Sequence, residues 1–134
     1  MPSTGFPVDT NILSELARPE PNAGVVRWAM SVQMIALSVV SLEEIFFGLA
    51  WKPNARIRAW FESFLDRHCL ILLLTPEIAK GSGTLRGGLA SKGRPRTQAD
   101  MLIAATAQIH QLTLVTRNVR DFDDCGIPLL NPFS

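Results

Sequence analysis

Residues 6–17 read Phe-Pro-Val-Asp-Thr-Asn-Ile-Leu-Ser-Glu-Leu-Ala and predict a strand, an acidic residue and a helix in direct succession. The short apolar run ends at Asp9, and apolar residues then recur at helical spacing until Pro19, which cannot continue a helix. The same alternation of short apolar runs and longer helical stretches returns along the chain. It is typical of βαβ units, so the expected fold class is α/β with a parallel sheet.

The boundaries of the expected elements follow from this alternation. Strands are predicted at residues 6–8, 34–38, 70–74, 113–115 and 128–130, and helices at 11–17, 23–32, 42–50, 54–67, 76–90 and 98–111, with a single turn at 119–122. Two segments are unusual. Pro7 is expected either to leave the first strand short of a ladder hydrogen bond or to delay its start. Glycines at 81, 83, 87 and 88 predict a fifth helix that is frayed or largely a loop.

Length and composition restrict the class of protein. The chain has 134 residues, 47% of them hydrophobic, and thirteen basic against twelve acidic residues give a net charge of +1. One domain over residues 1–134 is therefore expected, and a uniformly basic nucleic-acid binder is excluded. The longest apolar run, residues 69–74, is too short to span a membrane, so a cytoplasmic protein is expected. Cys69 and Cys125 are isolated and are interpreted as reduced.

Four acidic residues lie just past predicted strands or at the start of the helices that follow them. They are Asp9, Glu44, Asp100 and Asp121. The carboxyl ends of parallel strands share one edge of the sheet, and ligand sites form in the crevice beyond that edge. We therefore expect these four carboxylates to converge, although they are far apart in the sequence.

Converging carboxylates repel one another and need a counter-charge. Two unit charges 4 Å apart interact by about 4 kcal/mol at an effective dielectric constant near 20. A hard divalent cation, Mg²⁺ or Mn²⁺, is the natural partner, and such a site favours reactions of phosphate esters. The alternative is helix capping, since Ser41 to Glu44 and Thr97 to Asp100 each fit a capping box. The two interpretations are compatible, because a helix N-terminus favours an ionised carboxylate.

Four motifs in the chain resemble those of the PIN-domain ribonucleases. Val8-Asp-Thr-Asn-Ile-Leu-Ser-Glu15 resembles the opening motif of that family, and Ser41-Leu-Glu-Glu-Ile-Phe-Phe-Gly48 its second acidic motif. Asp100-Met-Leu-Ile-Ala-Ala-Thr-Ala107 and Leu114-Val-Thr-Arg-Asn-Val-Arg-Asp-Phe122 resemble the third and the fourth. The length and the Thr-Arg-Asn form of the last motif are most similar to the toxins of VapBC-type toxin–antitoxin pairs, in particular the FitB-like branch.

This resemblance implies an α/β/α sandwich around a parallel sheet of about five strands and a Mg²⁺- or Mn²⁺-dependent endoribonuclease activity. It also implies homodimers and inhibition by an antitoxin protein, through which alone operator DNA would be bound. The metal-binding acids would be Asp9, Glu44, Asp100 and Asp121, with supporting polar groups from Thr10, Asn11, Thr116 and Asn118. Glu43 is the alternative to Glu44, and Asn118, Asp123 or Asp124 could complete the site in place of Asp121.

Basic residues precede the third acid. Residues 78–99 contain no acid, and their five basic side chains are candidates for the approach of an RNA backbone: Lys80, Arg86, Lys92, Arg94 and Arg96. A solvated basic loop is the simpler alternative. Two other functions stay open. A phosphatase of the haloacid-dehalogenase type would need a second aspartate where this chain has Asn11, and a catalytically inactive domain would act only by binding partners.

Overall fold

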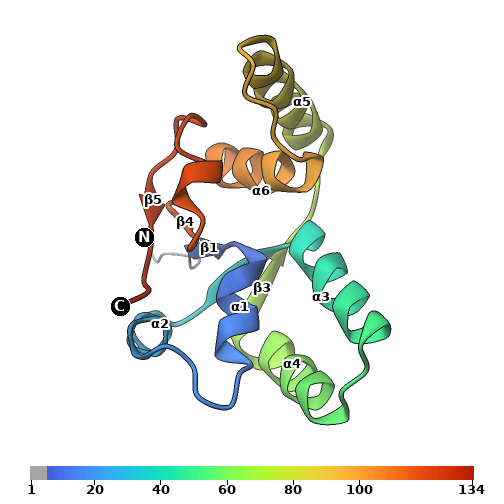
Figure 1. The fold of residues 1–134 in the computed structure, drawn as a ribbon, viewed down its shortest axis with the longest axis vertical. Coiled ribbons are helices and arrows are strands. Elements are labelled where there is room, and N and C mark those ends of the chain that lie inside the picture. The colour runs from blue at the N-terminus through green and yellow to red at the C-terminus, as the bar shows by residue number, and fades with distance from the viewer. Residues whose placement is uncertain (1–5) are drawn as a thin grey trace.

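The computed structural model describes residues 6–134 and has one five-stranded parallel sheet (Figure 1). The strands are short, as expected, and comprise β1 (Phe6–Val8), β2 (Ile35–Ser38), β3 (Cys69–Leu72), β4 (Leu114–Val115) and β5 (Leu129–Leu130). Their order in the sheet is β3-β2-β1-β4-β5. The chain therefore adds β2 and β3 on one side of β1 and β4 and β5 on the other. In such a sheet the crevice between β1 and β4 is the topological switch point at which ligands bind.

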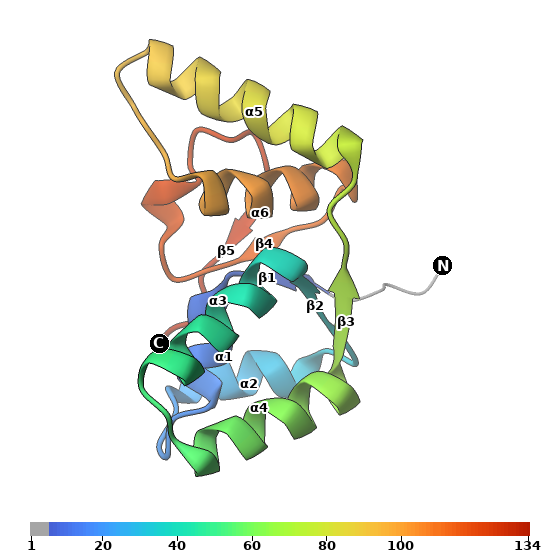
Figure 2. The ribbon, with the colours of Figure 1, turned by 90° about the vertical axis from the view of Figure 1, so that its right-hand side faces the viewer.

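Helices cover both faces of this sheet (Figure 2). They are α1 (Thr10–Leu16), α2 (Ala23–Ser31), α3 (Val39–Trp51), α4 (Ala55–His68), α5 (Pro76–Ser91) and α6 (Gln98–Ile109), followed by the short 3₁₀ helix η1 (Val119–Asp121). One hydrophobic cluster joins α1, α2, α3 and α4 to the sheet, and a second joins α5, α6 and β4. The predicted α/β/α sandwich is confirmed. No helix within residues 6–134 is both long enough and apolar enough to cross a membrane.

Pro7 lies inside β1, the central strand, where proline is rare. The strand starts before it, because Phe6 and Pro7 both pair with β2. The backbone N–H of Asp9 donates to Val115 O at 2.9 Å, on the β4 side. A donor at Pro7, two residues earlier, would face the same side, and pairing with β4 begins only at Val8. Pro7 therefore removes no ladder hydrogen bond.

The glycine-rich segment forms a regular helix, so the expectation of a frayed helix or loop was wrong. Helix α5 runs without interruption from Pro76 to Ser91, and the Thr75 side chain caps its start by accepting from the Ile78 N–H. Ile78, Ser82 and Leu89 are buried along its inner face. Helix α5 packs on α6 rather than on the sheet (Figures 1 and 2). This tertiary contact offsets the low helix propensity of the glycines.

Helix α3 starts three residues earlier than predicted, directly after β2. Ser38 is its N-cap, and the Ser38 hydroxyl accepts from the Val40 N–H at 3.1 Å. Ser41 is therefore inside the helix, and the capping box predicted for Ser41 and Glu44 is wrong. The consequence for the site is that Glu44 lies in the second turn of α3, where its side chain is free to face α1.

Candidate functional site

The site is built on Asp9, which follows β1 at the switch point and is only 6% exposed. Its carboxylate accepts three hydrogen bonds. One oxygen accepts from the Thr10 N–H at 2.8 Å, which makes Asp9 the N-cap of α1. The other accepts from Asn11 Nδ2 at 3.2 Å and from the Thr116 hydroxyl at 2.9 Å. These donors hold the carboxylate in one orientation at the carboxyl ends of β1 and β4.

Glu44 approaches from α3 and is held by α1. The Thr10 hydroxyl donates to Glu44 Oε1 at 2.7 Å across 34 residues of sequence. Glu43, by contrast, is exposed. The structure thus brings Glu44, and not its neighbour, to the edge of the sheet beside Asp9.

Asp100 lies in the first turn of α6, three residues after Thr97, as the capping box predicted for Thr97 to Asp100 requires. The Asp100 N–H donates to the Thr97 hydroxyl at 3.1 Å, so Thr97 is the N-cap of α6. A side-chain hydrogen bond with Thr97 lowers the pKa of the Asp100 carboxyl, against the larger effect of burial. It is half-buried, and the charges of Asp121 and Glu44 act on its pKa.

Asp121 and Asn118 lie at the two ends of the 3₁₀ helix that follows β4. The backbone N–H of Asn118 donates to the Thr116 hydroxyl at 2.9 Å, while that hydroxyl donates to Asp9. Thr116 is fully buried and therefore links the turn to the first acid. The Asn118 side chain makes no capping hydrogen bond, and it is exposed. The predicted support from Thr116 is thus direct, whereas Asn118 contributes through its backbone.

The four carboxylates influence one another electrostatically. Burial raises the pKa of Asp9 from 3.8 to about 6, and the charges of Asp100 and Glu44 add to this rise, against the hydrogen bonds from Thr116 and Thr10. Burial likewise raises the pKa of Asp100, and the negative charges of Asp121 and Glu44 contribute. Asp100 is therefore the member whose charge is coupled to all three others.

The donor set suits a hard divalent cation. Every candidate group is a carboxylate, hydroxyl or amide oxygen, and within residues 6–134 no basic side chain forms an ion pair with Asp9, Glu44, Asp100 or Asp121. The repulsion that adds to the effect of burial on the pKa of Asp9 is therefore not balanced by an ion pair within residues 6–134, although the charge of Arg96 lowers the pKa of Asp100. As the side chains stand, no three acidic, histidine or cysteine residues of the described chain are arranged to bind one ion together.

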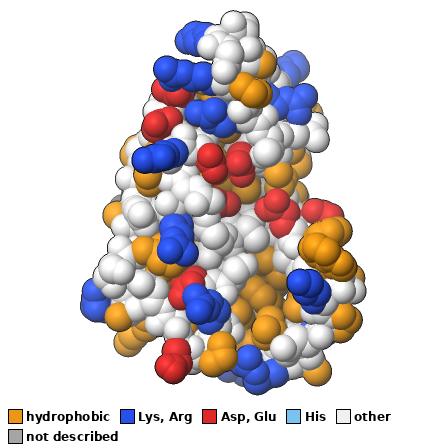
Figure 3. All heavy atoms as spheres, viewed as in Figure 1, with side chains coloured by type: hydrophobic (Ala, Val, Ile, Leu, Met, Phe, Trp, Pro, Cys, Tyr) orange, Lys and Arg blue, Asp and Glu red, His pale blue; other side chains and the backbone are white. Residues whose placement is uncertain are grey.

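The basic residues predicted for RNA approach divide into two groups. Lys80, Arg86 and Lys92 are exposed on α5 or at its end, whereas Arg94 and Arg96 form ion pairs with the acids after η1. Figure 3 shows acidic side chains gathered across the middle of one face and basic side chains around α5 above them. The five positive charges therefore do not form one free surface.

Asp123 and Asp124 take no part in the carboxylate group. The Arg94 guanidinium pairs with Asp124, and Arg96 Nη2 lies 3.7 Å from Asp124 Oδ2 and 3.9 Å from Asp123 Oδ1. Asp121 is the acid of this turn whose charge acts on Asp100.

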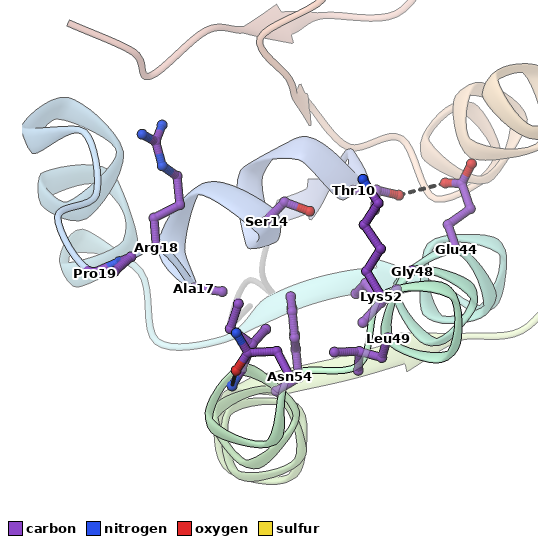
Figure 4. Close-up of a pocket in the computed structure, with 13 residues that line it drawn as sticks. Thr10, Ser14, Ala17, Arg18, Pro19, Glu44, Gly48, Leu49, Lys52 and Asn54 are labelled. Atoms are coloured by element: carbon purple, nitrogen blue, oxygen red, sulfur yellow. Dashed lines mark hydrogen bonds between the residues drawn. The ribbon is translucent and has the colours of Figure 1, made fainter.

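A pocket of about 310 Å³ opens beside Glu44, between α1, α3 and α4 (Figure 4). Thr10 and Glu44 form one end of it, and its walls are mostly apolar. The remaining lining residues are Ser14, Ala17, Arg18, Pro19, Ile45, Gly48, Leu49, Lys52, Asn54, Ile57 and Phe61. The sequence did not predict this pocket, because three helices that are separate in the chain contribute to it. Gly48 contributes to the open space of the pocket, because an added Cβ at this position would meet nothing within 4 Å.

Comparisons with known proteins agree with this geometry. The PIN domain family model matches residues 7–127. The VapC ribonuclease Y4jK of Sinorhizobium fredii is 30% identical, with 94% of this chain and 96% of that protein covered. The crystal structure of FitAcB from Neisseria gonorrhoeae is similar with a TM-score of 0.80 and 30% identity, covering 94% of this chain and 96% of that one.

A third similar structure is VapBC2 from Rickettsia felis bound to a DNA fragment from its promoter. The TM-score is 0.84 at 26% identity, and 94% of this chain and 97% of that one are covered. Residues 7–127, which the family model matches, include all four acids. On the extent of the family match and of these relatives, the chain belongs to the PIN-domain family.

Proposed function

We propose that this protein is a divalent-metal-dependent endoribonuclease, the toxin of a toxin–antitoxin pair, with Asp9, Glu44, Asp100 and Asp121 as its active-site acids. The observation that carries the proposal is the set of carboxylates at the switch point, which repel one another and form no ion pair with a basic side chain among the described residues. Relatives with nearly the same length are named ribonucleases. Nucleases of this VapC type depend in general on a divalent metal, and Mg²⁺ or Mn²⁺ suits the oxygen donors.

Each residue has a distinct role in this mechanism. Asp9 and Asp100 would bind the cation, and Glu44 and Asp121 would bind it directly or through water. When bound, such an ion polarises a phosphoryl oxygen and lowers the pKa of a coordinated water. The Thr116 hydroxyl donates to the Asp9 carboxylate and lowers its pKa against the larger effect of burial, so this contact favours the ionised form that a cation would bind.

Thr10 and Asn11 orient two of the acids. The Thr10 hydroxyl holds Glu44, and the Asn11 amide donates to Asp9 Oδ2. This last contact counts against a phosphatase of the haloacid-dehalogenase type, because the second position of such a site needs an aspartate and here it is a hydrogen-bond donor to the first. The substrate class proposed is therefore RNA.

The test compares two single-charge substitutions. Asp9→Asn should reduce Mn²⁺-dependent RNA cleavage to the level of the buffer alone, whereas Glu43→Gln, at the exposed neighbour of Glu44, should cleave like the wild type. A small aryl phosphate ester should not be hydrolysed by either protein. RNA cleavage by Asp9→Asn at the wild-type rate would exclude this active site, and hydrolysis of the ester alone would favour the phosphatase.

The apolar pocket supports the proposed antitoxin. Its walls suit an apolar side chain of a protein partner, and a segment seated there would lie against Thr10 and Glu44. Such a segment would cover the edge of the sheet that RNA must reach. A toxin–antitoxin complex from Klebsiella pneumoniae is among the similar solved structures.

Gly48→Leu tests the pocket, because the new side chain would enter open space in it. We expect weaker binding of the antitoxin encoded beside this chain, measured by calorimetry, with a folded protein. Gly83→Leu is the matched control, since Gly83 is also an exposed helical glycine with nothing within 4 Å. Equal affinities for the two variants would place the antitoxin elsewhere.

A further inference from the structure

Arg96 lies in the loop between α5 and α6, and its guanidinium is already occupied by contacts within the chain. Nε donates to the backbone carbonyl of Asp121 at 3.1 Å, and Nη2 donates to that of Arg120 at 3.5 Å. Nη1 donates to the carbonyls of Arg94 and Pro95 at 3.4 and 3.3 Å. Arginine has five N–H donors in a rigid fork, and these contacts engage all three nitrogens.

The charge of this guanidinium is matched by two acids after η1. Nη2 lies 3.7 Å from Asp124 Oδ2 and 3.9 Å from Asp123 Oδ1. The Arg96 side chain is only 18% exposed, compared with 58% for Arg94. A side chain with its donors used and its charge paired is poorly placed to bind a phosphate of RNA, which was the role expected from the sequence.

These contacts join two segments that carry different acids of the site. Arg96 immediately precedes Thr97, the N-cap of α6, and Asp100 lies in the first turn of that helix. The carbonyl that Arg96 Nε holds belongs to Asp121 itself. One side chain therefore connects the start of the helix bearing Asp100 to the backbone of Asp121, across 25 residues of sequence.

Among the described residues, no other side chain forms a hydrogen bond with Asp121. Asp121 is the last residue of a 3₁₀ helix of three residues whose N-cap lacks a side-chain hydrogen bond, so its own turn constrains it weakly. Its backbone N–H donates only within the turn, to Asn118 O at 3.0 Å. Groups behind the ligands of a metal site orient those ligands, and their loss weakens binding although they never touch the ion.

We propose that Arg96 is a positioning residue that holds Asp121 against Asp100, so that the two carboxylates can serve the same divalent cation. The inference rests on the proposed role of these two acids. Arg96 would then support the metal site, and of the five basic residues predicted to bind RNA only Lys80, Arg86 and Lys92 would be free to do so.

The experiment measures Mn²⁺ binding to the full chain without RNA, by electron paramagnetic resonance of the free ion. Arg96→Ala should bind Mn²⁺ about 10- to 100-fold more weakly than the wild type, the range typical of lost supporting groups. Arg94→Ala is the matched control: it removes a neighbouring guanidinium that pairs with Asp124 but touches no atom of Asp121, so its Mn²⁺ affinity should equal that of the wild type. Asp100→Asn should abolish the binding.

A second substitution covers the case in which Arg96→Ala does not fold, as judged by thermal unfolding. Arg96→Lys keeps the charge but replaces a planar fork by a single ammonium, so we expect it to fold and to bind Mn²⁺ more weakly than the wild type. Wild-type Mn²⁺ affinity in a folded Arg96→Ala or Arg96→Lys protein would overturn the proposal. A lower salt dependence of RNA binding in that protein would then assign Arg96 to RNA instead.

The wild-type protein separates failure of this inference from failure of the proposed function. If the wild type binds Mn²⁺ and Asp100→Asn does not, the metal site stands and the variants of Arg96 decide the inference. If the wild type itself binds no Mn²⁺, the proposed metal site is wrong and the role of Arg96 falls with it.

Discussion

Asp9→Asn is expected to stabilise the metal-free protein at neutral pH although it abolishes activity. In the folded chain, burial and the nearby negative charges raise the pKa of Asp9 from 3.8 to about 6. The fold therefore prefers the protonated carboxyl, and ionisation of Asp9 works against folding. Asparagine has nearly the same shape and no charge, so it removes this cost.

The sign and the size follow from linkage between proton binding and folding. Because the folded pKa lies above the unfolded one, the contribution of Asp9 to stability is fully present below pH 3.8 and is lost as the pH rises through about 6. The shift of about two pKa units corresponds to about 3 kcal/mol. Part of this is already lost at pH 4, so the difference in unfolding free energy between Asp9→Asn and the wild type should become about 2 kcal/mol more favourable to the variant from pH 4 to pH 8.

The substitution also changes hydrogen bonds, but that effect does not depend on pH. Asp9 Oδ2 accepts from Asn11 and Thr116, and an amide nitrogen at that position would lose about 1 kcal/mol of this bonding. This loss lowers the unfolding free energy of Asp9→Asn by the same amount at every pH, so it does not alter the pH dependence. The change between the two pH values is thus the quantity to measure.

The assay is urea unfolding in EDTA at pH 4 and at pH 8, with Glu43→Gln as the control. Glu43 is exposed, so its substitution should give the same difference at both pH values. Excess Mn²⁺ at pH 8 should reverse the ranking, because only the wild type gains stability from the bound ion. A pH-independent difference for Asp9→Asn would refute the reasoning, since it would mean that the folded chain does not disfavour the ionised carboxyl.

Three further substitutions test other contacts. Thr116→Val removes the hydroxyl that donates to Asp9, so the pKa of Asp9 should rise further. The rise, measured by NMR in EDTA, should be about one unit or more, because a hydrogen bond to a charged group is lost. Thr116→Ser keeps the hydroxyl and should leave the pKa unchanged. Glu15→Gln should lower stability by about 1 kcal/mol at pH 7, and by less as the pH falls below 4.5. The reason is that a backbone hydrogen bond from Asn22 lowers the pKa of this buried carboxyl. Equal losses at pH 7 and pH 3 in urea unfolding would contradict this. Gly24→Ala should cost about 1–3 kcal/mol in thermal unfolding, since its Cβ would lie 2.3 Å from a carbonyl of the C-terminal segment, and a wild-type melting temperature would show that this segment is not packed there.

Much of the fold was predictable because its signals are local. The apolar run before Asp9 and the helical spacing after it lie within one short stretch, and so do the Thr97 cap and the first turn of α6. The glycine-rich helix α5 was not predictable in the same way. Its stability comes from packing on α6, which propensity along the chain does not contain.

The residue types of the site could be predicted from the sequence, but not all of their contacts could. Topology places the ends of parallel strands at one edge, so Asp9 and the residues after β4 were expected to meet. The choice of Glu44 over Glu43 depends on the helix starting at Val39, which brings Glu44 to the Thr10 hydroxyl. Glu15, the last residue of the opening motif, was not recognised as buried, because its partner is a backbone N–H seven residues away.

The succession of strands, acids and helices along the chain, and with it the family, could be predicted from the residues, because period, capping and motif spacing are properties of neighbouring residues. The role of each charge depends on tertiary contacts. Arg96 stands in a run of five basic residues that looks like one surface for RNA, yet its guanidinium meets the carbonyl of Asp121 and the acids beyond it. The interaction of a charge with its surroundings depends on distance and burial in the folded chain, and neither can be derived from the order of the residues alone.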